Sequence, residues 1–177
     1  MSEHAFELLG LALGFEIDSA LLQKNFIAKC AQLHPDRFVD PLDQADAAME
    51  MALVTGAHEQ LVDAESRANV LLLILGGSSK EADKSLPGDL LMDMMEVREA
   101  QERAAQTADQ AELNRLHQWA QQQRAEAINR VKALFNKVEM GPVRAAGDTE
   151  VFKAIRLELN ALRYYARMLE QLAKDMA

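Results

Sequence analysis

The chain has 177 residues, of which 49% are hydrophobic and 27% charged, and its formal net charge is −9. This balance is typical of a soluble globular protein, and the negative charge argues against a general affinity for nucleic acid. The longest wholly apolar run covers residues 70–75, far short of the roughly 20 residues that cross a bilayer. Residues 1–4 lack the pattern of a signal peptide, so we expect a cytoplasmic protein.

Four helices are expected in the first half, because helical periodicity runs through it and no long stretch alternates apolar and polar residues. They cover about residues 5–9, 19–33, 43–63 and 65–75. Asp18 is a good N-cap for the second helix, and Pro35 ends it because a residue before proline is pushed out of the helical region. The fourth is apolar on all sides near its end and should be buried. Gly76 and Gly77 then stop the helix and begin a linker.

Three long helices are expected in the second half, over about residues 89–107, 109–138 and 148–174. Asp89 can cap the first, and Gly141-Pro142 breaks the chain between the second and third. Long helices with short connections favour an antiparallel bundle. Residues 1–79 hold 12 acidic and 4 basic residues, whereas residues 80–177 hold 16 and 15. Such a shift in charge indicates two domains, so we expect an all-α protein built from two domains.

Cys30 is the only cysteine. It allows no intrachain disulfide, and the chain has no cysteine cluster for zinc or an iron–sulfur centre. Cys30 falls on the apolar side of an expected helix, where a small buried thiol is the ordinary interpretation. His4, His58 and His117 stand alone in the sequence and are expected to be surface or capping residues. We therefore expect no metal and no cofactor.

The tripeptide His34-Pro35-Asp36 follows a 15-residue amphipathic helix and precedes a loop and another helix. This arrangement resembles the J-domain of DnaJ-type co-chaperones. The resemblance implies that the loop docks on a DnaK-type ATPase chaperone and triggers ATP hydrolysis there. In that family, basic residues on the helix before the loop face an acidic surface of the chaperone. The basic residues here are Lys24, Lys29 and Arg37.

Later segments narrow the resemblance to the HscB family of iron–sulfur co-chaperones. Residues 65–73 (ESRANVLLL) are similar to the segment that closes the J-domain in that family, and residues 90–99 (LLMDMMEVRE) resemble its signature on the first bundle helix. Residues 130–135 and 162–165 fit later family segments. The resemblance implies a J-domain over residues 1–76, a linker over 77–88 and a C-terminal three-helix bundle over 89–177. The absence of a zinc-binding N-terminal extension favours a bacterial protein.

The resemblance also implies two protein partners, an HscA-like chaperone for the J-domain and an IscU-like iron–sulfur scaffold protein for the bundle. The positions that match the scaffold-binding surface of the family are Leu91, Met92, Met95, Glu96, Glu99 and Tyr164.

The residue pattern of the bundle helices supports an exposed surface, because two helices carry more apolar residues than one seam needs. On the first bundle helix the core seam is Leu90, Met94, Val97 and Ala104, with Leu91 and Met95 on a neighbouring face. On the last helix the core seam is Ile155, Leu159, Leu162 and Leu169. A second stripe there consists of Leu157, Ala161, Tyr164 and Met168. Spare apolar faces indicate an exposed patch of the kind that binds a protein partner.

We therefore expect a monomeric adaptor that is not an enzyme and that binds neither nucleic acid nor a membrane. Three other hypotheses remain open. The protein could be a J-protein adaptor for a different client, or a helical module that self-associates through its apolar stripes. It could also be a hydrolase that uses His34 and Asp36, although no nucleophile or pocket accompanies that pair in the sequence.

Overall fold

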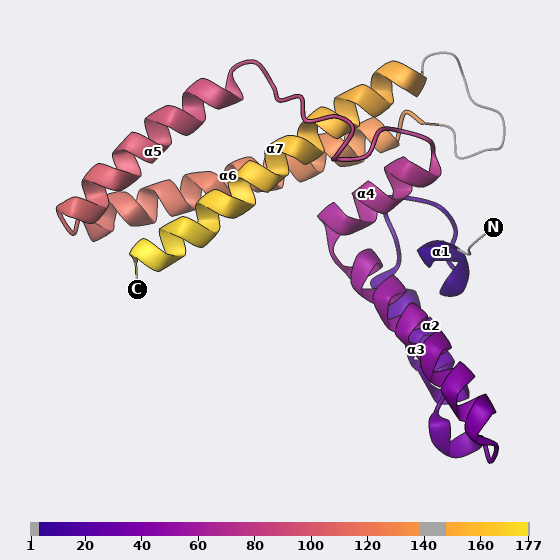
Figure 1. Cartoon of the computed structure of the whole chain (residues 1–177). Coiled ribbons are helices and arrows are strands. Elements are labelled where there is room, and N and C mark those ends of the chain that lie inside the picture. The colour runs from indigo at the N-terminus through magenta and orange to yellow at the C-terminus, as the bar shows by residue number, and fades with distance from the viewer. Residues whose placement is uncertain (1–3, 139–147, 177) are drawn as a thin grey trace. The chain divides into compact units, whose positions relative to one another are not determined.

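The computed structural model describes residues 4–138 and 148–176 (Figure 1). Every regular element in these ranges is a helix, which confirms the all-α prediction. The chain divides into two compact units, Met1–Leu75 and Gly76–Ala177. Among the described residues, no helix combines the length and the apolar character that crossing a membrane requires. The expected break at Gly141-Pro142 lies outside the described residues.

The described residues of the first unit form four α-helices and one short 3₁₀ turn. They are α1 (Ala5–Leu8), α2 (Ser19–Gln32), η1 (Pro35–Arg37), α3 (Pro41–Val62) and α4 (Ala64–Ile74). The α-helix bounds lie within two residues of those predicted, because local signals set them. The Asp18 carboxylate accepts hydrogen bonds from the amides of Ala20 and Leu21, as expected of an N-cap. Gly76 follows α4 with φ +80°, a conformation that favours glycine.

Helix α3 is the centre of the first unit, with α1, α2 and α4 packed against it (Figure 1). The largest fully buried side chains of this unit are Phe6, Leu9, Leu61, Leu71 and Leu72. Leu73 is exposed, so the expected burial of the end of α4 is wrong at this residue. The Phe26 ring stacks on the His58 ring at 4.0 Å between centroids, and His58 Nε2 lies 3.2 Å from Gln23 Oε1. His58 therefore links α3 to α2.

Arg67 ties the start of α4 to two other segments of the first unit. Its Nε donates to the carbonyl oxygen of Phe15 over 2.8 Å, and its Nη1 donates to that of Leu61. The guanidinium carbon lies 5.3 Å from the centroid of the Phe15 ring. Burial lowers the pKa of Arg67, and the nearby Asp63 carboxylate opposes that shift. Because planar guanidinium groups can serve several acceptors at once, one side chain holds three segments together.

The second unit contains α5 (Leu90–Gln106), α6 (Gln110–Phe135) and α7 (Asp148–Asp175). Helices α6 and α7 pack along much of their length, whereas α5 packs mainly on α6 and touches α7 at few points. Figure 1 shows α5 meeting α6 at their short connection and diverging from it toward the start of α5. Arg130 Nε of α6 donates to Glu158 Oε1 of α7 over 2.9 Å, and this bond raises the pKa of Arg130.

Helix α7 is covered on more sides than the sequence suggested. Its expected core residues Ile155, Leu159 and Leu162 are buried. Ala161 and Met168, expected on a spare stripe, are also buried, and Met168 joins a cluster with Ala104 of α5 and Leu113 of α6. The prediction of a free second stripe is therefore wrong for these two residues, and for Met168 the reason is that α5 and α6 both pack against it.

Residues 76–88, which we call the connecting segment, are held on α7 by two buried polar side chains. Arg156 donates from Nε and Nη2 to the carbonyl oxygen of Ser78. Asn160 Nδ2 donates to the carbonyl oxygens of Asp83 and Ser85, over 3.0 and 2.9 Å. Asp89 precedes α5, but its side chain accepts no capping hydrogen bond, so its predicted role as a cap is wrong.

Candidate functional site

The His34-Pro35-Asp36 loop forms a capped turn between α2 and α3. His34 has an extended backbone (φ −62°, ψ 128°), as a residue before proline prefers, and α2 therefore ends at Gln32. Pro35 starts the 3₁₀ turn η1, where its missing amide hydrogen costs nothing. The turn is closed by hydrogen bonds from the amides of Arg37 and Phe38 to the carbonyl oxygens of His34 and Pro35, each 3.0 Å long.

The two polar side chains of the loop are exposed and lie close to one another. The Asp36 side chain is 88% exposed and that of His34 is 58% exposed. His34 Nδ1 accepts a hydrogen bond from the Asp36 amide at 3.3 Å and lies 3.6 Å from the Asp36 carboxylate. The Asp36 carboxylate therefore faces solvent beside the His34 ring.

The three basic residues near the loop do not form one face. Lys24 and Lys29 are both exposed on α2, but five residues of helix separate their directions by about 140°. Arg37 follows the loop and turns back, because its Nη1 donates to the carbonyl oxygen of Ala31 over 3.3 Å. The structure therefore separates Lys29 from Lys24 around α2, while Arg37 reaches back to the last turn of that helix.

The predicted scaffold-binding residues lie at the start of α5 and in the middle of α7. Four of them are exposed apolar side chains, with exposed fractions of 58% for Leu91, 68% for Met92, 59% for Met95 and 38% for Tyr164. Glu96 and Glu99 are exposed on α5. Since an exposed run of large apolar side chains is uncommon on a monomer, we define Leu91, Met92, Met95 and Tyr164 as the apolar patch.

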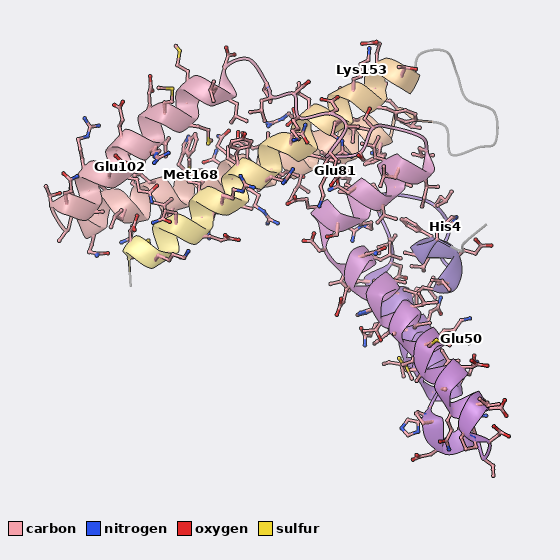
Figure 2. The ribbon with its side chains drawn as sticks, viewed as in Figure 1. His4, Glu50, Glu81, Glu102, Lys153 and Met168 are labelled. Carbon is pink, nitrogen blue, oxygen red and sulfur yellow. The ribbon has the colours of Figure 1, made fainter. Side chains whose placement is uncertain are left out.

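The apolar patch borders a groove between α5 and α7. This groove has a volume of about 850 Å³, and Leu91, Met95 and Tyr164 line it. Glu102 and Met168, both labelled in Figure 2, line it from α5 and α7. Glu96 instead lines a second groove of about 440 Å³, between α5 and α6, together with Arg103 and Arg115. The structure brings Leu91, Met95 and Tyr164 together and places Glu96 on the other side of α5.

Comparison with known proteins identifies the family. A model described as the HSCB C-terminal oligomerisation domain matches residues 86–173. A co-chaperone protein HscB homolog of Vibrio cholerae serotype O1 (strain M66-2) is 36% identical over 107 residues, covering 59% of this chain and 63% of that protein. A co-chaperone protein HscB homolog of Shewanella baltica (strain OS185) is 27% identical over 173 residues, covering 96% of this chain and 94% of the relative. The chain belongs to the HscB family.

The HscB fold also extends over nearly the whole chain. The solved structure of chaperone HscB from Vibrio cholerae matches with a TM-score of 0.77 at 23% identity, covering 97% of this chain and 96% of that one. At such low identity this likeness shows the fold alone. The 36% identical match spans less than two thirds of the length of that relative. The predicted membership of the HscB family is confirmed.

Residues of the groove floor were missed by reasoning from sequence. Gln101 is buried and donates from Nε2 to Asp175 Oδ2 over 2.6 Å, and Gln171 donates to the other carboxylate oxygen over 3.1 Å. Gln101 and Asp175 are 74 positions apart, so no local sequence pattern in this HscB-family chain predicts their hydrogen bond. In the described ranges, no three His, Cys, Asp or Glu residues are grouped as a metal site would require.

Proposed function

We propose that this HscB-family protein is a co-chaperone of iron–sulfur cluster assembly. In this proposal the His34-Pro35-Asp36 loop stimulates the ATPase of a DnaK-type, HscA-like chaperone, and the bundle brings an IscU-like scaffold protein to it. The observation that carries the proposal is an intact, exposed loop between two hairpin helices, in a chain whose relatives bear the name co-chaperone HscB. The proposed setting is the bacterial cytoplasm, and the proposed state is a monomer.

The shape of the loop suits a trigger that acts on another protein. Its 3₁₀ turn begins with Pro35, and backbone hydrogen bonds close that turn. The loop therefore loses little conformational entropy when it binds a partner. The Asp36 carboxylate and the His34 ring face outward, where they can accept and donate hydrogen bonds to a partner. In the proposed function this protein catalyses no reaction itself, since ATP is hydrolysed in the active site of the chaperone.

The apolar patch suits a protein client. Methionine side chains adapt to irregular surfaces, and tyrosine is a frequent hot spot of protein interfaces. Glu99 and Glu96 lie on α5 beside the patch and would form a polar rim. Glu96 does so from the side of α5 that faces the second groove. One chain that holds both partners raises the effective concentration of the client near the ATPase, which couples client release to ATP turnover.

A single-turnover ATPase assay with the HscA-like chaperone tests the loop. We expect Asp36→Asn to lower the stimulated rate at least about tenfold, because the substitution removes a charged acceptor from a docking surface. The matched control is Asp43→Asn, which removes the same charge from an exposed position in the first turn of α3 and should leave stimulation intact. Full stimulation by Asp36→Asn would disprove the assignment of the loop.

Calorimetric titration with the scaffold protein tests the patch. A triple variant, Leu91→Ala with Met92→Ala and Tyr164→Ala, should weaken binding by at least about two orders of magnitude. The matched control truncates three exposed apolar residues of α3, Leu42, Met49 and Leu53, and should bind as the wild type does. If the patch variant binds the scaffold with unchanged affinity, the client of the bundle is a different protein or lies on a different surface.

A further inference from the structure

Two methionines of the apolar patch are open to solvent. Met92 is 68% exposed and Met95 is 59% exposed. In the ranges that the structure describes, the only other exposed methionine is Met49 on α3, at 64%. The remaining described methionines are partly or fully buried, among them Met94 and Met168. Exposed methionine in the described chain is therefore concentrated at the start of α5.

Met92 and Met95 lie three positions apart on α5, which makes them neighbours on the surface of the helix. Met95 lines the groove between α5 and α7 together with Leu91 and Tyr164. Methionine resembles leucine in size and apolar character, but its thioether sulfur can be oxidised. The two methionines therefore give the apolar patch a chemical sensitivity that leucine at the same positions would not.

A peroxide converts an exposed methionine to methionine sulfoxide. With hydrogen peroxide, a lone pair of the sulfur forms a bond to one peroxide oxygen while the O–O bond breaks. The hydroxide that is released takes the proton from the transferred oxygen and leaves as water. The sulfur loses two electrons, the peroxide gains them, and the apolar side chain acquires a polar S=O group.

Oxidation of the two patch methionines should leave the second unit folded. Met168, which packs in the core cluster with Leu113 and Leu172, is only 9% exposed and is thereby protected. The side chains of Met92 and Met95 lie largely in solvent, where water can hydrate a sulfoxide oxygen. When a partner covers the patch, that oxygen loses its water and needs a hydrogen-bond donor. Without such a donor the partner binds more weakly.

We propose that Met92 and Met95 form a peroxide-sensitive modification site that controls binding of the scaffold protein. The patch with both thioethers binds the scaffold, the patch with both sulfoxides binds it weakly, and methionine sulfoxide reductases reverse the change. This inference rests on the proposed function, because it concerns the surface to which the scaffold is assigned. A bound scaffold in turn covers both side chains and slows their oxidation.

Calorimetric titration of the IscU-like scaffold with peroxide-treated protein tests the inference. Catalase removes the remaining peroxide before the scaffold is added, peptide mass spectrometry measures oxidation at each methionine, and circular dichroism checks the fold. Full oxidation of Met92 and Met95 in the wild type should weaken binding at least about tenfold. Unchanged affinity of this oxidised protein would overturn the inference.

A double variant, Met92→Leu with Met95→Leu, separates the patch from other oxidisable groups, because it keeps Cys30 and the remaining methionines. It should bind the scaffold within about threefold of the wild type before treatment and change by less than about twofold after it. The matched control is Met49→Leu, which removes the exposed methionine of α3 and should lose affinity on oxidation as the wild type does. Equal losses in the treated double variant and the treated wild type would overturn the inference.

Reversal of the oxidation in the wild type is a second measurement, and it needs no substitution. Both classes of methionine sulfoxide reductase are required, because each reduces one epimer of the sulfoxide. Affinity should return once mass spectrometry shows that Met92 and Met95 are thioethers again. Affinity that stays low after their reduction would overturn the inference, since damage at another site would then be responsible.

Failure of the inference differs from failure of the proposed function. If the untreated wild type does not bind the scaffold, or if saturating scaffold leaves the oxidation rates of Met92 and Met95 unchanged, the assignment of the scaffold to the patch is wrong. We expect bound scaffold to slow these two rates at least about fivefold and to leave that of Met49 unchanged. With that result the assignment holds, and the affinity of the oxidised wild type alone decides the inference.

Discussion

Arg156 donates two hydrogen bonds, from Nε over 2.9 Å and from Nη2 over 2.6 Å, to the carbonyl oxygen of Ser78, 78 positions earlier in the chain. The Arg156 side chain is almost fully buried. Burial lowers the pKa of its guanidinium, while the carboxylates of Asp83 and Glu81 oppose that shift. Because these carboxylates belong to the connecting segment, the buried cation holds residues 76–88 on α7 by charge as well as by hydrogen bonds.

Arg156→Ala should reduce the free energy of unfolding of the second unit by about 2–4 kcal/mol. The variant leaves the Ser78 carbonyl without its donor and opens a cavity beside α7. Trp119 is the only tryptophan of the chain and lies on α6, so its fluorescence during urea unfolding reports on this unit. Arg167→Ala on the exposed side of the same helix is the control and should change stability by less than about 0.5 kcal/mol. Equal stabilities of the two variants would contradict the anchoring role of Arg156.

Asn160→Asp should destabilise the second unit in a pH-dependent manner. At neutral pH the new carboxylate would face the carbonyl oxygens of Asp83 and Ser85 without a proton to donate, at a cost of about 3 kcal/mol. Repulsion and burial would raise its folded pKa above the unfolded value of about 4, so stability falls as the pH rises from about 4 through the folded pKa. The loss relative to wild type should therefore shrink as the pH is lowered from 7 to about 4. Urea unfolding at pH 7 and pH 4 measures it, and a loss that is independent of pH would contradict this account.

Leu90 and Leu91 are neighbours in the sequence with opposite expected effects on stability. Leu90 is 4% exposed, whereas Leu91 belongs to the apolar patch. Leu90→Ala should cost about 2–4 kcal/mol because it leaves a cavity under α5, and Leu91→Ala should cost less than about 0.5 kcal/mol. Urea unfolding followed by Trp119 fluorescence compares the two variants. A large loss of stability in Leu91→Ala would show that this residue packs in the unit and is not free for a partner.

Asp18 and Asp89 look alike in the sequence, since each precedes a helix, but only Asp18 caps one in the structure. Asp18→Ala should lower the free energy of unfolding by about 1 kcal/mol, because two amides of α2 lose their acceptor. Asp89→Ala should change it by less than about 0.3 kcal/mol, since no capping bond is lost. Thermal unfolding followed by far-ultraviolet circular dichroism measures both. Equal losses would mean that Asp89 caps α5 in solution.

The helices and the loop could be predicted from the sequence because the signals that set them act within a few residues. Three such signals are the Asp18 cap, the stop at Pro35 and the left-handed Gly76. Each depends only on interactions between neighbouring residues, and the structure confirms each. The residues of the candidate site could also be named from the sequence. Their helical spacing shows which of them share a side of α5.

What only the tertiary structure decided is which helix faces are covered. Periodicity placed Ala161, Tyr164 and Met168 on one stripe of α7, but Ala161 and Met168 are buried, and Met168 packs against residues of α5 and α6. The pairing of Arg156 with Ser78, like that of Gln101 with Asp175, joins positions more than 70 residues apart. The sequence predicts the direction in which each side chain points around its own helix. The neighbour that the side chain meets depends on how helices pack, and that is a property of the folded chain as a whole.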